Sequence, residues 1–460
     1  MASATGPTAA PAPTVVPREL ARLTVLGALV GVPAGLVAFG FVSLVHLLEQ
    51  LLWTTLPERL GSDGPPWWLV LALPTLAGVL VHLARRLPGD GGHAPIQGLA
   101  GGTPRPRDAA GVALAALATL PFGVVLGPEA PLTALGTVVG VWVTSWARLP
   151  GKGPAVLGVA GAGAAMSTLF GGPLVAGLML LEGGVGAGAL VVPLLVPALV
   201  ASAVAYVLVT GLGGWTGLPV AGMALPGLPE YESVLVRDLL AALVVGVVAA
   251  LLARAVRRAA TALHGMDAPT GRLPLLVAGG LVVGACALVA QALGADPQDV
   301  LFSGQASIPA VVGASTAGAV LVLLVAKAVA FAVSLGAGFR GGPIFPAVFL
   351  GVALASFGVV GFGMSPTAAV AVGTAAGMTA MTRMVLAPLM FAALLTGRQG
   401  LDALPLAVVA TALAWLTSAA VDHRLEARRQ GAAAHDASAT ARAGAALPAH
   451  GSRGAADERG

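Results

Sequence analysis

Two short stretches that interrupt helices carry the residue types best suited to chemistry in this chain. The first, "LGPEAP" (Leu126–Pro131), places the acidic residue Glu129 between two prolines in apolar surroundings. The second, "GGPIFP" (Gly341–Pro346), repeats the glycine and both prolines 215 residues later, without the acid. A carboxylate in membrane-embedded sequence costs at least about 2.5 kcal/mol on insertion scales, so its position alone makes Glu129 a candidate functional residue.

Each pentapeptide is a turn that leads into a helix, over 131–143 and 346–358. The first four N–H groups of a helix have no intrahelical partner, and the helix dipole adds about half a positive charge at the same end. A helix start is therefore an anion site. Two such starts, brought together by symmetry near the middle of a membrane, would make a pore positive without burying a lysine or an arginine.

Glu129 has two interpretations at such a site. Its carboxylate can compete with a permeating anion for the same N–H groups, so that it blocks the pore when ionised and opens it when protonated or displaced. Alternatively, it interacts only with the dipole of its own helix. The second pentapeptide, which supplies a matching helix start, favours the gate.

The elements that position these turns must lie in a membrane. The chain has 460 residues, of which 57% are hydrophobic and 10% charged, with a mean hydropathy of +0.92. Soluble domains carry about 25% charged residues, so this chain lacks the polar residues needed to cover a soluble core. The net charge of +4 comes from short basic loops, which membrane topology explains better than nucleic-acid binding. With one cysteine and scattered histidines, we expect no metal site and no cofactor.

The apolar segments fall into two classes. Spanning a membrane takes roughly 20 apolar residues, and the segments predicted to do so are 22–48, 67–87, 188–211, 236–262, 273–293, 316–335 and 402–420. Segments bounded by Gly or Pro are predicted to be too short or too broken, at 108–121, 130–147, 154–168, 173–182, 346–361, 366–381 and 387–397. Broken helices at membrane depth are tolerated where they line a cavity, as in transporters and channels.

An internal repeat accompanies this pattern. "AAMSTLFGGPL" (164–174) aligns with "TAMTRMVLAPL" (379–389) at the offset of 215 that relates the pentapeptides. We therefore predict an all-α integral membrane protein of two inverted repeats with broken and half-length helices, whose site lies at the repeat interface. The predicted parts are a disordered tail (1–19), a first half (20–211), an extracellular connector (212–235), a second half (236–420) and a disordered cytoplasmic tail (421–460).

The distribution of charge predicts the orientation. Arginines and lysines cluster in one set of loops, whereas segments 57–66 and 212–236 carry acids with few cations. Basic loops favour the cytoplasmic side. A multi-pass protein of the cell membrane with both termini in the cytoplasm is expected.

These motifs resemble those of the CLC family of chloride channels and chloride/proton antiporters. Its gating motif G-R/K-E-G-P is similar to Gly127–Pro131, and its G-x-F-x-P motif is similar to Gly342–Pro346. The similarity spans roughly 20–420, with the motifs in the family's order. It implies a homodimer in the lipid bilayer with one pore per subunit, a gate at Glu129, and an anion such as chloride held by Gly127, Pro128, Glu129, Ala130, Gly342, Pro343, Ile344 and Phe345.

The chain also departs from the family pattern. Pro128 stands at a usually basic position, and Ala130 replaces a glycine. The family's G-S-G-I-P anion loop corresponds to "GGHAPIQG" (91–98), which would bring Gly92 and Ala94 to the anion without a serine hydroxyl. The family's coordinating tyrosine has no counterpart, since the only tyrosines are Tyr206 and Tyr231. Backbone N–H groups are therefore expected to do most of the binding, and the preferred anion stays open.

Glu182 is the second acid of interest. By resemblance it falls on the first of two acids that end a helix in family antiporters, and Gly183 falls on the proton relay. A shift of one residue would make Glu182 the relay and a possible proton path. Otherwise it is a helix-end carboxylate that reaches the cytoplasm or pairs with a loop arginine. Proton-coupled antiport and passive conduction therefore both remain open.

Two other functional classes fit the sequence less well. A different inverted-repeat transporter could carry an organic solute or another anion such as fluoride, but a cation site would need midplane acids beyond Glu129 and Glu182. An enzyme is not expected, because the hydrophobic region contains no HExxH, GxSxG or paired Asp/His pattern. A nucleotide-binding P-loop is also absent from the sequence.

Overall fold

The computed structural model describes residues 17–97, 104–147, 153–183, 191–216, 223–266 and 272–445. Within these ranges the protein is helical and has no named strand. Nine helices of the described residues are long and apolar enough to cross a membrane. The predicted all-helical membrane fold is confirmed.

The seven long apolar segments are all helices. They are α1 (Pro17–Gln50), α3 (Trp67–Ala84), α8 (Val191–Thr216), α9 (Val236–His264), α10 (Leu273–Ala292), α13 (Ala317–Ala337) and α17 (Leu404–Ala445). Large apolar side chains such as Leu29, Val207 and Leu321 are exposed on them. Exposed apolar faces of this kind suit contact with lipid.

The shorter segments are also helical. They form α4 (Ala109–Leu117), α5 (Glu129–Trp146), α6 (Gly153–Phe170), α7 (Pro173–Glu182), α14 (Ile344–Phe362), α15 (Pro366–Thr382) and α16 (Leu386–Thr396). These segments were predicted to be too short or too broken to span, but α6 and α14 reach 18 and 19 residues and are long and apolar enough to do so. Pro154 and Pro346 lie in the first turn of these helices, where a missing N–H breaks no intrahelical hydrogen bond.

Short elements complete the described chain. A π-helix, η1 (Leu51–Thr55), continues α1 into α2 (Leu56–Arg59), and α11 (Pro297–Val300) and α12 (Ile308–Val312) precede α13. The 3-10 turns are η2 (Pro95–Gln97), η3 (Pro106–Asp108), η4 (Leu120–Phe122) and η6 (Gly397–Ala403).

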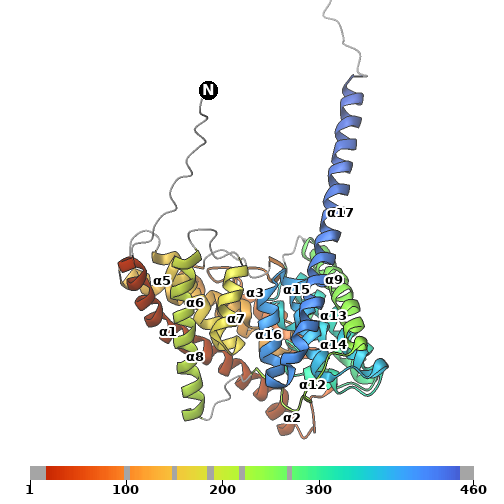
Figure 1. Ribbon diagram of the computed structural model, residues 1–460, viewed down its shortest axis with the longest axis horizontal. Coiled ribbons are helices and arrows are strands. Elements are labelled where there is room, and N and C mark those ends of the chain that lie inside the picture. The colour runs from red at the N-terminus through yellow and green to blue at the C-terminus, as the bar shows by residue number, and fades with distance from the viewer. Residues whose placement is uncertain are drawn as a thin grey trace, which may run out of the picture. The chain divides into compact units, whose positions relative to one another are not determined.

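The two halves repeat one arrangement. In each half, the helix that follows the pentapeptide packs against the next one, α5 on α6 and α14 on α15. Equivalent glycines allow the close approach, because a Cβ would lie 2.3 Å from the Gly161 carbonyl oxygen at Gly136, and 2.0 Å from that of Gly373 at Gly351. In Figure 1, α1 and α5–α8 lie on one side of the helical body, and α9 and α13–α15 on the other. The halves also meet where α7 packs against α16.

The segments predicted as connector and tails differ from that expectation. Helix α8 runs to Thr216, into the predicted connector, and residues 217–222 lie outside the described ranges. The rest of the connector packs on the second half, since the N–H groups of Leu225 and Tyr231 donate to the carbonyl oxygens of Leu395 and Gln399. The segment predicted as a tail from 421 is helical to Ala445, and 1–16 and 446–460 lie outside the described residues.

Candidate functional site

The two pentapeptides meet in the interior of the protein. The Gly127 N–H donates to the Gly342 carbonyl oxygen at 2.8 Å, and the Gly342 N–H donates to the Gly127 carbonyl oxygen at 2.6 Å. This pair forms an isolated antiparallel bridge between equivalent residues of the repeat. Reciprocal bonds between equivalent positions are what a pseudo-two-fold axis produces. The predicted convergence of the two turns is therefore present in the structure.

Both turns lead directly into helices. Helix α5 begins at Glu129 after Pro128, and α14 begins at Ile344 after Pro343. Neither proline caps its helix with a side-chain hydrogen bond. The first backbone N–H groups of both helices can therefore donate hydrogen bonds to an acceptor from elsewhere.

Glu129 joins one helix start to the other. Its side chain is fully buried, and Oε1 accepts a hydrogen bond of 2.5 Å from the Ile344 N–H, the first of α14. Oε2 is buried without a hydrogen-bond partner among the described residues. The carboxylate thus occupies a helix-start anion site in the other half of the protein.

Gly127 and Gly342 make room for that carboxylate. A Cβ at Gly127 would lie 2.0 Å from Oε2 of Glu129, and a Cβ at Gly342 would lie 2.1 Å from its Cδ. Any side chain here would push the carboxylate out of its place. The two glycines therefore serve a steric purpose in addition to forming the turns.

An aromatic cluster closes one side of the site. The rings of Phe170 and Phe345 are stacked with centroids 5.4 Å apart, and Phe391 meets both edge-on, at 5.2 Å from Phe170 and 5.9 Å from Phe345. The rings come from α6, α14 and α16 and are almost completely buried. We did not identify this cluster from the sequence, because its members are far apart and only Phe345 lies in a motif.

The described part of the predicted anion loop makes no described contact with the pentapeptides. Gly92, with φ of +91°, donates its N–H to the Gly89 carbonyl oxygen at 2.8 Å within its own turn. A Cβ at Gly92 would meet Val112 and no atom of the pentapeptides. Ala94 is half-buried in the same loop, and residues 98–103 lie outside the described ranges. No described contact brings Gly92 or Ala94 to Glu129.

Arg340 connects that loop to the second turn. Its side chain is 5% exposed, and Nη2 donates to the Asp90 carbonyl oxygen at 2.8 Å and to Oδ2 of Asp90 at 2.9 Å. Arg85 also pairs with Asp90, at 2.9 Å. A Cβ at Gly338 would lie 3.2 Å from Arg85 and 3.7 Å from Arg272, so three arginines gather around the Gly338–Arg340 segment. This arginine cluster places positive charge beside the second turn.

Glu182 has a different environment from Glu129. Its Oε1 accepts hydrogen bonds from the N–H groups of Val385 at 2.9 Å and Leu386 at 2.7 Å, and its Oε2 accepts one from Ala387 at 2.9 Å. These are the N–H groups of the residue before α16 and of its first two residues, so Glu182 caps that helix. The expected pairing with a loop arginine is replaced by backbone N–H groups.

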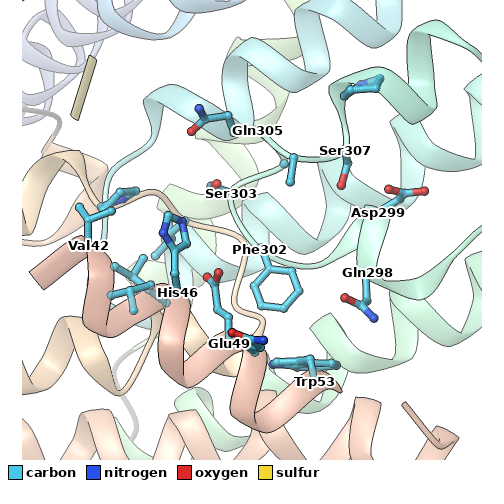
Figure 2. Close-up of a pocket in the computed structure, with 18 of the residues that line it drawn as sticks. Val42, His46, Glu49, Trp53, Gln298, Asp299, Phe302, Ser303, Gln305 and Ser307 are labelled. Carbon is cyan, nitrogen blue, oxygen red and sulfur yellow. The ribbon is translucent and has the colours of Figure 1, made fainter. Parts of the chain in front are cut away.

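A cavity of about 850 Å³ lies beside the end of α1. It reaches Leu126 and Pro128 of the first pentapeptide, next to Glu129. Figure 2 shows His46 and Glu49 projecting from α1 toward the segment that carries Phe302 and Ser303. The charged or titratable side chains of its described lining are His46, Glu49, Asp296 and Asp299.

The described lining of the cavity and the arginine cluster have no residue in common. The cavity adjoins the end of α1 and the residues after it, which lead into the start of α3 at Trp67. Arg85 follows the other end of α3, at Ala84. At about 1.5 Å per residue, the 18 residues of α3 separate its ends by about 27 Å.

Lys327 is buried behind the cavity. Its Nζ donates to the carbonyl oxygens of Asp299 and Leu301 at 2.8 Å each and lies 4.5 Å from the centroid of the Phe349 ring. Lys327 thus holds the chain around α11 in place. Burial is the largest cause of the raised pKa of Asp299, and the nearby charge of Asp296 raises this pKa further. The hydrogen bond with Ser307 and the positive charge of Lys327 lower it in part.

Tyr231, in the predicted connector, makes a structural contact. The Tyr231 hydroxyl donates to Oδ2 of Asp238 at 2.8 Å, and burial together with Asp238 raises the pKa of Tyr231 to about 12. No described contact links Tyr231 to the pentapeptides. Side-chain ligands for an anion at this site would have to come from other residues.

Comparison with known proteins gives a consistent result. Residues 89–419 match the family described as "Voltage gated chloride channel". The chain is 29% identical over 348 residues to the putative ion-transport protein YfeO of Escherichia coli (strain SMS-3-5 / SECEC), covering 73% of this chain and 79% of the relative. It is 28% identical over 350 residues to the protein of the same description in Salmonella choleraesuis (strain SC-B67), covering 73% and 80%.

Two solved structures have a similar fold. A slow cyanobacterial Cl⁻/H⁺ antiporter aligns with a TM-score of 0.72 and 17% identity, covering 89% of this chain and 96% of that one. A CLC-type fluoride/proton antiporter aligns with a TM-score of 0.69 and 21% identity, covering 88% and 97%. At these identities the likeness establishes the fold.

Proposed function

Because the chain belongs to the voltage-gated chloride channel (CLC) family and is thus an anion channel or anion/proton antiporter, we propose that Glu129 is its gate. The observation that carries this proposal is the hydrogen bond from the Ile344 N–H to Oε1 of Glu129. A carboxylate bound there takes the place that the helix start offers to a permeating anion. Transport then requires the carboxylate to leave.

The chemistry of the opening step follows from the two oxygens. Oε1 is bound, whereas Oε2 is buried without a described partner, which is costly for an ionised carboxylate. A proton on Glu129 removes the negative charge and weakens the bond to Ile344. Anion flux is therefore expected to rise as the pH falls.

The anion is proposed to bind to backbone N–H groups at the two helix starts, within Gly127–Ala130 and Gly342–Phe345. Pro128 and Pro343 have no N–H, so they shape the turns while their neighbours donate. Chloride is the ligand proposed from the family, with fluoride as the alternative. The described residues support no contribution from Gly92, because its N–H is used within its own turn.

Glu182 is proposed as a cap of α16 in preference to a proton path. Three hydrogen bonds satisfy both of its oxygens, and a proton carrier would have to give them up in each cycle. An organic solute is less well supported, because the space at Glu129 is that of one carboxylate between two glycines. The protein is further proposed to act as a homodimer with both termini in the cytoplasm.

Chloride efflux from proteoliposomes, with simultaneous recording of pH, tests this function. The account predicts chloride efflux that increases at low pH in the parent and is high at every pH in Glu129→Gln. Proton movement locked to chloride movement would identify an antiporter, and its absence a channel. A Glu129→Gln protein that conducts like the parent at all pH values would contradict the gate.

A further inference from the structure

The cavity beside Pro128 has an unexpected charge for an anion pathway. Glu49, Asp296 and Asp299 are acidic, His46 is the other titratable side chain, and the described lining contains no lysine or arginine. The nearest buried cation, Lys327, lies behind Asp299 and is bound by carbonyl oxygens. When these acids are ionised, their negative charges repel chloride from this cavity and raise the local concentration of protons.

The arginine cluster has the opposite charge. Arg85, Arg272 and Arg340 gather there, and both Arg85 and Arg340 pair with Asp90. Such a cluster attracts anions. The acidic cavity and the arginine cluster therefore favour ions of opposite charge. The acidic cavity needs a role other than supplying chloride.

Uncommon backbone geometry surrounds the acidic cavity. The π-helix η1 begins two residues after Glu49, and π-turns occur often at functional sites. Trp53 of η1 donates its indole N–H to the Pro121 carbonyl oxygen at 2.9 Å and packs against Phe302, which has a φ of +60°. Conformations of this kind persist where the surroundings enforce them, and they cluster at functional sites.

The unpartnered oxygen of Glu129 is a second, independent observation. Oε2 is completely buried, and the residue before Glu129, Pro128, lines the cavity, whereas Glu129 itself is not one of its described lining residues. A negative charge near a carboxylate favours its protonated form. The acids of the cavity therefore favour the state in which Glu129 leaves the N–H of Ile344.

We propose that this acidic cavity is a proton-loading vestibule, in which Glu49 and Asp299, with His46 and Asp296, supply protons to Glu129. The inference rests on the proposed gate and adds the residues that control how easily the gate is protonated. The positive charge of Lys327 opposes the effect of Asp299 on Glu129. Arg340 and Asp90 are charged residues of the arginine cluster, outside the described cavity lining. Glu49 carries the largest expected share, since no described cation neutralises it across the cavity.

The test measures chloride efflux from proteoliposomes as a function of pH, with the full chain and the same pH on both sides. Glu49→Gln removes a negative charge, so Glu129 should lose its proton more readily. The midpoint of the pH profile should move to lower pH by about half a unit or more. Maximal flux at low pH should stay at the parent level, which also shows that the variant is folded.

Two further variants separate charge from structure. Glu49→Asp keeps the charge and should retain the parent midpoint. Glu58→Gln removes an exposed acid of α2 that does not line the cavity, and should also leave the midpoint unchanged. An unchanged midpoint in Glu49→Gln, or an equal shift in Glu58→Gln, would overturn the vestibule.

Glu129→Gln distinguishes failure of the vestibule from failure of the gate. If this variant loses its pH dependence while Glu49→Gln keeps the parent midpoint, the gate stands and the vestibule is wrong. If Glu129→Gln keeps the parent pH dependence, the gate itself is wrong, and the vestibule has no group to load.

Discussion

Two carboxylates of the first half each bind the start of a helix in the second half, and they do so differently. Glu129 holds one N–H of α14 through Oε1 and leaves Oε2 buried without a described partner. Glu182 binds three N–H groups at the start of α16, those of Val385, Leu386 and Ala387, with both oxygens and is half-buried. The incompletely bound carboxylate is suited to leave, whereas the fully bound one is suited to stay. Hydrogen bonding thus distinguishes the proposed gate from the proposed cap where sequence position alone does not.

The largest expected effect comes from removing the charge of Glu129. Glu129→Gln should raise chloride efflux at neutral pH by about tenfold or more, since a loss of about 1.4 kcal/mol in closed-state preference is sufficient. Stability should be equal or higher, because an uncompensated buried charge is lost. Efflux assays and thermal unfolding in detergent measure the two effects. Lower stability with unchanged efflux would make Glu129 resemble Glu182.

Gly342→Ala should reproduce this effect in part without changing any charge. Its Cβ would lie 2.1 Å from Cδ of Glu129, so the carboxylate must move away from Ile344. We expect efflux at neutral pH to increase about threefold or more, since roughly 0.6 kcal/mol corresponds to that ratio. Gly361→Ala, which has no atom within 4 Å of its Cβ, is the matched control. Equal efflux in both variants would show that the glycine does not hold the carboxylate in place.

Glu182→Gln should have the opposite signature. The amide side chain cannot make the three charge-assisted bonds to α16, and the cost is expected to be about 2 kcal/mol of unfolding free energy. The pH profile of efflux should keep the parent shape. A large change in proton movement with unchanged stability would instead identify Glu182 as a proton path.

Arg340→Gln should give the smallest effect of the set. It removes the contact between the Asp90 loop and the second turn, and it lowers the positive charge of the arginine cluster. Efflux at low salt should fall by about twofold, and the difference should shrink as salt screens the arginine cluster. A reduction that does not depend on ionic strength would indicate a purely structural role.

The sequence predicted the helices and the meeting of the two turns well, because both depend on local patterns. Apolar length marks membrane helices, and Gly127–Pro131 and Gly342–Pro346 break them at equivalent places. The offset of 215 residues then implied an interface between repeats. The structure confirms that interface through the bridge between Gly127 and Gly342.

The partners of the carboxylates could not be predicted in this way. Which N–H group Glu129 or Glu182 binds depends on helix positions set to within an ångström by packing across the two halves. The contact between Asp90 and Arg340 joins residues 250 apart with no pattern in common. The acidic cavity combines α1 with the residues around α11, which are unremarkable in sequence when taken singly.

The most direct measurement is a crystal structure of Glu129→Gln grown with bromide, using anomalous scattering to locate the ion. The account predicts a bromide peak beside the N–H of Ile344, in the space that the Glu129 carboxylate occupies in the parent, and no such peak in the parent at neutral pH. Bromide bound only at the arginine cluster, or at no position between the two helix starts, would contradict the account.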